Sequence, residues 1–265
     1  VRAGWRGGAE GCGGDGAVDY YGFVPGNGIT AVEINDHATS VGQFYSCITK
    51  LLGFRPMRHE GKITGLAAFG KNTELVEHFG NFFRYNSDDR IERYPFEKPK
   101  KLSSAEFAEA GMGLGAKINF NTSENEVGRQ YAMNGIKLYN RIQELCKGHT
   151  KEDIAYACQL VTENVVVAHT KRIHDRFFPG KQITVCLAGG LFANVRVNQE
   201  LFEMEQISNV FVQPAMGDAG LSLGAAIMCD LERRNIVDTD DYRFIDTYLG
   251  PDYADEVEAF VKQQG

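Results

Sequence analysis

Residues 186–194 read Cys-Leu-Ala-Gly-Gly-Leu-Phe-Ala-Asn, and residues 214–220 read Pro-Ala-Met-Gly-Asp-Ala-Gly. The first segment ends an apolar run, so it predicts a buried strand at 182–187 that breaks at two glycines and opens a helix carrying Asn194. The second segment follows a short predicted strand at 209–212 and precedes a helix of small residues. Two strand–glycine–helix junctions this close in sequence favour an α/β fold.

The paired glycine turns also predict a ligand site. Glycine lets the backbone approach a phosphate or sugar, and each following helix offers unpaired N–H groups and a positive dipole end. One such turn is an ordinary connector in α/β proteins, so the prediction depends on the pair. Gly189, Gly190, Asn194 and Gly217 are therefore candidates for a nucleotide pocket. Asp218 is a candidate metal or ligand contact, and the alternative is that it caps the next helix.

Composition narrows the class of protein. The chain has 265 residues, 43% of them hydrophobic, and a formal net charge of −7, which does not indicate binding to nucleic acid or to a membrane surface. The six cysteines include no Cys-x-x-Cys pair, which favours buried thiols in a reducing cytoplasm. No signal peptide or long apolar span occurs, so we expect a cytoplasmic location. The chain opens without a methionine, and we expect it to be part of a longer protein truncated at its N-terminus.

The rest of the chain divides into periodic and irregular segments. Residues 1–8 have no strand or helix period, and residues 71–125 are predicted to form an irregular insertion. The order of elements after residue 150 predicts a mainly parallel sheet covered by helices. The periodic segments predict a hairpin at 17–34, helices at 40–52, near 58–70, at 126–146 and at 150–178, with Gly53, Gly148 and Pro179-Gly180 as stops.

Two further segments are candidate ligand contacts. Lys62 stands in Glu-Gly-Lys but has no glycine at position 56, so this is not a phosphate-loop signature. The alternative for Lys62 is a solvated side chain, although the glycines around it favour a loop that faces a ligand. The run at 11–16 contains Gly13, Gly14 and Asp15, and consecutive small residues of this kind can form an anion-binding turn. The alternative for that run is a glycine-rich chain end.

Taken in order, six motifs make the chain resemble the O-carbamoyltransferases, a family that includes nodulation-factor, cephamycin and tobramycin carbamoylation enzymes. The resemblance spans roughly residues 10 to 255. The motifs lie at Gly11–Gly16, Tyr45–Phe54, Glu60–Gly70, Gln159–Glu163, Leu187–Asn194 and Pro214–Ala226.

The resemblance implies a fold and a domain division. It implies an α/β fold of the actin/Hsp70/sugar-kinase (ribonuclease H-like) type, in the form shared with threonylcarbamoyl-adenosine synthases. Residues 1–248 would be a partial carbamoyltransferase domain of this form. Residues 249–265 would begin the linker to an adenylate-forming domain that the chain does not contain.

The resemblance also implies a reaction. The adenylate-forming domain would make carbamoyl-adenylate from ATP and carbamoyl phosphate, and the kinase-like domain would pass the carbamoyl group to the hydroxyl of a small molecule. Carried over by motif, the adenylate-binding residues are Gly13, Gly14, Asp15, Lys62, Gly65, Gly189, Gly190, Asn194 and Gly217. Asp218 would be the catalytic residue and would bind a divalent metal of the iron type, which could polarise the mixed anhydride.

Three departures from the family pattern affect this interpretation. A family histidine pair lies upstream of the region present, Glu10 stands where the family has aspartate, and the adenylate-forming domain is missing. We therefore expect the chain by itself to be inactive. The alternatives are a nucleotide-binding module without catalysis and a kinase of the same superfamily. The acceptor and the oligomeric state are not readable from the sequence.

Overall fold

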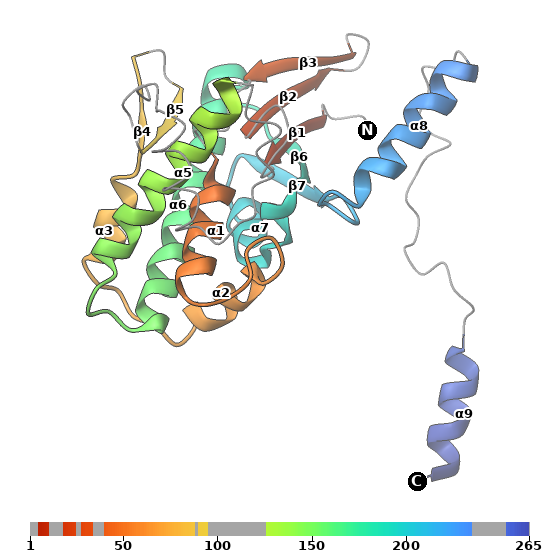
Figure 1. Cartoon of the computed structure of the whole chain (residues 1–265). Helices are drawn as coiled ribbons and strands as arrows, with labels where there is room; N and C mark the ends of the chain where they lie inside the picture. Colours follow the sequence, from red (N-terminus) through yellow and green to blue (C-terminus); the bar gives the residue numbers. More distant parts are fainter. Residues whose placement is uncertain are drawn as a thin grey trace. The chain divides into compact units, whose positions relative to one another are not determined.

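The computed structural model describes residues 5–10, 18–24, 28–33, 40–87, 90–94, 126–234 and 253–264 (Figure 1). The chain divides into two compact units, Val1–Asp218 and Ala219–Gly265, which we describe separately. The first unit has a mixed α/β architecture in which a five-stranded sheet and a group of helices with a small two-stranded sheet are joined by a long helix.

The sheet has five strands in the order β3-β2-β1-β6-β7. Strand β1 pairs with β2 antiparallel and with β6 parallel, β2 pairs with β3 antiparallel, and β6 pairs with β7 parallel. The predicted hairpin is confirmed. The prediction of a mainly parallel sheet holds only for β1, β6 and β7, because β2 and β3 run antiparallel and make the sheet mixed. The strand bounds are β1 (Trp5–Glu10), β2 (Val18–Val24), β3 (Gly28–Glu33), β6 (Ile183–Ala188) and β7 (Ile207–Val212).

Strand β1 corrects the interpretation of the N-terminal residues, which show no strand period in the sequence. Trp5–Glu10 forms the central strand of the sheet. Its middle residues are Gly7 and Gly8, which contribute no side chain to an alternating pattern, and this hides the strand from periodicity. The pairing with β2 and β6 decides the assignment.

The helical part of the unit is formed largely as predicted. Helix α1 begins after Ser40, whose hydroxyl accepts a hydrogen bond from the backbone N–H of Gln43 at 3.1 Å. Helix α6 begins after Thr150, which caps the N–H of Asp153 in the same way. The bounds are α1 (Val41–Leu51), α2 (Glu60–Ala67), α3 (Leu75–Gly80), α5 (Glu126–Leu145) and α6 (Lys151–Phe177).

The first part of the segment that the sequence predicts to be an irregular insertion has regular secondary structure. Residues 71–94 form α3 and a hairpin of β4 (Phe83–Tyr85) and β5 (Ile91–Arg93). Leu75 and Phe79 of α3 are completely buried, and the Phe79 ring lies 5.4 Å from the Phe44 ring of α1. This segment therefore belongs to the core. Its elements are too short for periodicity to reveal them, and residues 88–89 and 95–125 lie outside the described residues.

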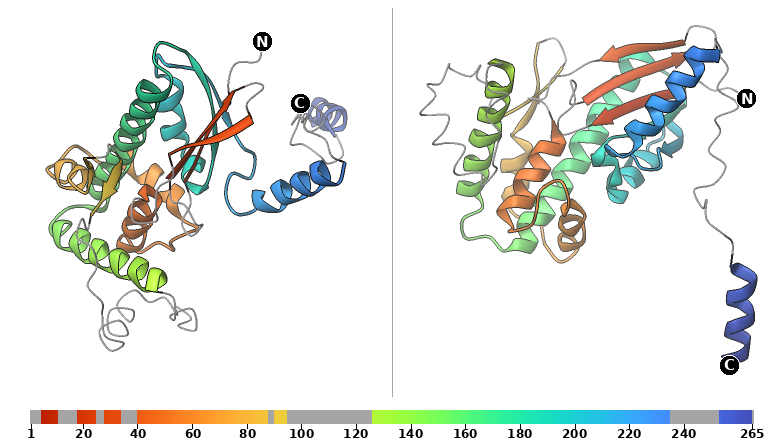
Figure 2. Two further views of the ribbon diagram at one scale, coloured as in Figure 1. Left: turned by 90° about the horizontal axis from the view of Figure 1, so that it is seen from above. Right: turned by 45° about the vertical axis from the view of Figure 1, so that its right-hand side comes forward.

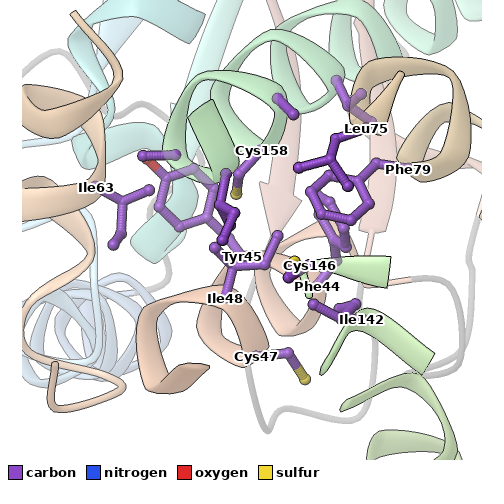
Figure 3. Packing of buried hydrophobic residues seen from close by; sticks show 14 of the residues in the cluster. Phe44, Tyr45, Cys47, Ile48, Ile63, Leu75, Phe79, Ile142, Cys146 and Cys158 are labelled. Carbon is purple, nitrogen blue, oxygen red and sulfur yellow. The ribbon is translucent and has the colours of Figure 1, made fainter. Parts of the chain in front are cut away.

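Helix α6 connects two hydrophobic cores. Its first half contributes Ile154, Cys158 and Val161 to a helical core, which Figure 3 shows together with side chains of α1, α2, α3 and α5. Its second half contributes Val166 to a core between the sheet and helix α7 (Val195–Phe202). Figure 2 shows α6 beside the sheet from two further directions. Since one helix serves both cores, a displacement of α6 affects the helical group and the sheet together.

Strand β6 shows the alternation expected of a sheet with one well-covered face. Ile183, Val185 and Leu187 are buried in the core with α6 and α7, and the residues between them are partly exposed. Cys47, Cys146 and Cys158 are buried, as the sequence predicts, whereas Cys186 is partly exposed and Cys229 is exposed. Burial raises the pKa of the buried Cys146 thiol to about 12. Such thiols are not nucleophiles at neutral pH.

The second unit contains helices α8 (Gly220–Arg234) and α9 (Ala254–Gln264). Across the part of the chain that the structure describes, no helix combines the length and the apolar character needed to span a bilayer.

A close contact at Gly70 generates a stability prediction. A Cβ atom added there would lie 2.1 Å from the carbonyl oxygen of Glu152 and 2.7 Å from Cβ of Tyr156. Because both atoms belong to the rigid helix α6, we expect Gly70→Ala to lower the free energy of unfolding by about 3 kcal/mol. Gly65 of α2 has open space at its Cβ position, so Gly65→Ala should instead raise it by about 1 kcal/mol. Urea denaturation measures both, and equal effects of the two substitutions would contradict the predicted contact.

Candidate functional site

The two predicted glycine turns lie next to each other at one edge of the sheet. Strands β6 and β7 run parallel, so their carboxyl ends meet there. The N–H of Gly189 donates to the carbonyl oxygen of Met216 at 2.6 Å, and the N–H of Gln213 donates to that of Leu187 at 2.9 Å. These hydrogen bonds join the first turn directly to the second. The carboxyl edge of parallel strands is where open α/β sheets bind their ligands.

Backbone conformation explains why glycine stands at one of these positions. Gly189 has φ +113°, where a side chain would be strained, whereas Gly190 has open space at its Cβ position and no such φ. Ala215 in the second turn has φ +56°, an uncommon conformation for a residue with a side chain. Gly189 is thus required by the turn itself. At Gly190 the local fold requires no glycine, so the open space is available to a ligand.

The third glycine segment follows the neighbouring strand. Strand β1 is parallel to β6, and Ala9 pairs with Ala188. Strand β1 therefore ends at the same edge of the sheet as the two turns, and the run at 11–16 follows it in the sequence. Gly13, Gly14 and Asp15 themselves lie outside the described residues.

Asn194 occupies a different position from the one predicted. A short 3-10 helix, η3 (Gly190–Ala193), follows the glycines, and Asn194 precedes α7 instead of lying within a helix. Its side-chain oxygen accepts hydrogen bonds from the backbone N–H groups of Arg196 at 3.1 Å and Val197 at 3.3 Å. Asparagine is a preferred residue at such a cap because it satisfies unpaired N–H groups. The side-chain oxygen of Asn194 therefore has a structural task, which is to cap α7.

The Asn194 amide also pairs with Gln159 of α6, through both its nitrogen and its oxygen. The Asn194 nitrogen donates to the Gln159 oxygen at 2.9 Å, and the Gln159 nitrogen donates to the Asn194 oxygen at 3.1 Å. Gln159 also donates to Glu163 at 2.8 Å and accepts from the Tyr45 hydroxyl at 2.8 Å. All four hydrogen-bonding positions of the Gln159 amide are thereby used. We call Thr64, Tyr45, Gln159, Glu163 and Asn194 the amide network.

The amide network reaches helix α2 through Tyr45. The Tyr45 hydroxyl lies 2.9 Å from the Thr64 hydroxyl, and burial raises the pKa of Tyr45 far above its usual range. Tyr45 consequently stays protonated and remains a donor to Gln159. The network joins α2, α1 and α6 to the first glycine turn, and four of the sequence motifs contribute to it.

Gln159 and Glu163 belong to one of the six sequence motifs, but neither is among the site residues that the sequence predicts. Gln159 is 6% exposed and Glu163 is 8% exposed, and the nearest guanidinium nitrogen of Arg196 lies 3.7 Å from Glu163. Their spacing of four positions, which places two polar side chains on the same face of a predicted helix, is the signal that could have identified them.

Lys62 and Gly65 lie on the exposed side of α2. The Lys62 ammonium lies 5.4 Å from the centroid of the Phe54 ring. Lys62 is two residues from Thr64, about 200° around the helix, so the two side chains leave α2 in different directions. The structure connects α2 to the glycine turn through Thr64, and the predicted convergence of Lys62 with Gly190 stays a prediction.

Gly217 and Asp218 end the first unit, and Asp218 is exposed. Among the residues described, no three His, Cys, Asp or Glu side chains come together as a group that could hold a metal ion. A single carboxylate does not make an iron site, because iron in such sites needs further imidazole or carboxylate ligands. The described residues therefore do not by themselves fit the predicted metal.

Comparison with known proteins identifies the family. The family model described as "Carbamoyltransferase N-terminus" matches residues 13–227. An uncharacterised protein of Methanocaldococcus jannaschii is 28% identical over 194 residues, which cover 73% of this chain and 26% of that protein. Nodulation protein NolO of Bradyrhizobium diazoefficiens is 36% identical over 126 residues, which cover 46% of this chain and 22% of its own length.

Nodulation protein NolNO of Sinorhizobium fredii is 26% identical over 241 residues, which cover 91% of this chain and 30% of its own length. The chain thus spans between about a fifth and somewhat over a third of the lengths of the curated relatives it matches. The family model spans most of the chain and encloses both glycine turns and the whole amide network. This chain therefore belongs to the carbamoyltransferase N-terminal family.

Proposed function

We propose that this chain binds carbamoyl-adenylate at the paired glycine turns and serves the transfer of the carbamoyl group to an acceptor hydroxyl. The observation that carries the proposal is the direct connection of the turns through Gly189 and Met216, with Asn194 fixed beside them. The family match and the nodulation relatives support carbamoyl transfer as the reaction type.

The fold proposal rests on the sheet. We infer an actin/Hsp70/sugar-kinase (ribonuclease H-like) arrangement, in which the nucleotide lies against strand ends that open into glycine turns. The support is that β1, β6 and β7 run parallel and each is followed by a glycine-containing segment at the same edge. The two described turns at one edge, after β6 and β7, suit a ligand that carries phosphate.

The proposed reaction is an acyl transfer. The acceptor oxygen bonds to the carbamoyl carbon, the bond from that carbon to the phosphate oxygen breaks, and AMP leaves with the electron pair. The proton of the acceptor hydroxyl passes to a base or to solvent. ATP and carbamoyl phosphate are the proposed sources of the adenylate, and the acceptor is a small hydroxylated molecule.

Individual residues have separate proposed tasks. The open space at Gly190 lets the phosphate approach the backbone at the start of η3. Lys62, whose ammonium is exposed, would neutralise phosphate charge. Gly13, Gly14, Asp15, Gly65 and Gly217 would line the same ligand. Asp218 remains the proposed metal ligand, but no step is assigned to a metal because the described residues do not form a site for one.

The first test concerns nucleotide binding. Gly190 is exposed and has open space at its Cβ position, so Gly190→Val should fold normally yet block the ligand. We expect calorimetry to show ATP and AMP binding to the chain and at least a tenfold loss in this variant. Gly80→Val, at the end of α3 with equally open space, is the matched control and should bind normally. Unchanged binding in Gly190→Val would place the nucleotide elsewhere.

The second test concerns reaction type. The longest protein that the gene encodes should be supplied with ATP, carbamoyl phosphate and hydroxylated acceptors. We expect AMP and pyrophosphate together with an O-carbamoyl ester, because the phosphate bond to adenosine is retained in the leaving group. Chromatography of the nucleotides and mass spectrometry of the acceptor measure both. Release of ADP with a phosphorylated acceptor would identify a kinase, and binding without turnover would identify a non-catalytic module.

A further inference from the structure

We infer that Gln159 is a positioning residue: it fixes the Asn194 amide so that one of its N–H groups is left for a phosphate oxygen of the ligand. This inference rests on the proposed function, because it assigns a task within the same nucleotide site. Gln159 itself is buried in α6 and does not contact the ligand in this proposal.

The orientation of the Gln159 amide is determined by its neighbours. Glu163 is a carboxylate that accepts hydrogen bonds, so the group facing it at 2.8 Å is the Gln159 nitrogen. The protonated Tyr45 hydroxyl donates at 2.8 Å to the opposite side of the amide, which is the oxygen. Reversing the amide would place the Gln159 oxygen against the Glu163 carboxylate oxygen and the Gln159 nitrogen against the Asn194 nitrogen. One orientation is therefore strongly preferred.

The orientation of Asn194 follows from both of its partners. Its oxygen faces the backbone N–H groups of Arg196 and Val197 and the Gln159 nitrogen. Its nitrogen donates one hydrogen to the Gln159 oxygen at 2.9 Å. A side-chain amide carries two hydrogens, and within the described ranges the second has no acceptor. The partly buried Asn194 therefore presents one unused donor beside the glycine turn.

The unused donor selects an acceptor atom. Asn194 stands at the N-terminus of α7, where the helix dipole favours negative charge. A phosphate oxygen satisfies the amide hydrogen and is attracted by the same end of the helix. A ribose hydroxyl could also accept this hydrogen bond, but it carries no negative charge for the helix end to attract. We therefore assign the phosphate of the nucleotide, and not its sugar, to this position.

Gln159→Glu separates positioning from simple structural support. A carboxylate has nearly the shape of the amide but cannot donate to Asn194 or Glu163 when ionised. Burial and the adjacent Glu163 should raise the pKa of the introduced carboxyl. Lowering the pH protonates it, which restores one donor at the site of the lost amide group. Binding in this variant should therefore recover in acid, whereas the amide of the wild-type chain does not titrate.

The experiment measures the affinity for AMP between pH 5 and pH 8 as the ratio of variant to wild type, so that titration of the phosphate cancels. We expect Gln159→Glu to bind about tenfold or more weakly at pH 8 and to approach the wild type at pH 5. The control is Gln199→Glu in α7, since Gln199 is exposed and also donates to a glutamate four residues on, Glu203. The ratio of the AMP affinity of Gln199→Glu to that of the wild type should stay near one over the whole pH range.

Adenosine provides the second arm, because it lacks the phosphate. We expect Gln159→Glu to leave adenosine affinity within about twofold of the wild type at every pH. Equal losses for AMP and adenosine would show that Gln159 supports the fold without positioning a phosphate contact. A ratio for AMP that does not change with pH would also overturn the inference.

Failure of this inference is distinguishable from failure of the proposed function. If the wild type binds no AMP, or Gly190→Val binds it normally, the nucleotide site is overturned and the inference with it. If Gly190→Val loses AMP but Gln159→Glu matches the wild type at all pH values, only the positioning role is overturned. Proton exchange of the Asn194 side chain gives an independent measurement: one amide hydrogen should exchange more slowly than the other, and equal rates would contradict the fixed orientation.

Discussion

The paired hydrogen bonds between Gln159 and Asn194 are the interaction on which the site depends. They join a buried position in α6 to the junction between the glycine turn and α7. An amide suits this place because it donates and accepts at once without the desolvation penalty of a net charge. Glu163 and Tyr45 complete the hydrogen bonds of Gln159, so none of its amide positions is left unsatisfied.

Helix α6 gives this local interaction its wider effect. The helix contributes side chains to both hydrophobic cores. Between these contacts, Gln159 of α6 forms the hydrogen bonds of the amide network that reach α1 and the glycine turn, and through Tyr45 the network reaches α2. Close packing makes such a helix resist small displacements. The sheet edge, the Glu-Gly-Lys helix and Asn194 are therefore held in one arrangement by a single element.

The glycine turns combine rigidity with open space. Gly189 adopts a conformation that side chains disfavour and is tied to the second turn through Met216, in which the neighbouring Ala215 also has a positive φ. Uncommon backbone conformations of this kind persist only where surrounding contacts hold them, and they concentrate at functional sites. Gly190, next in the chain, is by contrast unconstrained and exposed. The combination suits a ligand that lies against the backbone.

The sequence by itself determined the elements whose signals are local. The hairpin strands, the long helices and the strands before the two glycine turns follow from neighbouring residues and are confirmed. Only the tertiary structure decided that β1 is central, that 71–94 belongs to the core and that Asn194 caps α7 while pairing with Gln159. These depend on contacts between residues far apart in the chain, such as the 35 positions between Gln159 and Asn194. Periodicity describes one segment at a time, so it cannot specify which buried polar groups satisfy one another.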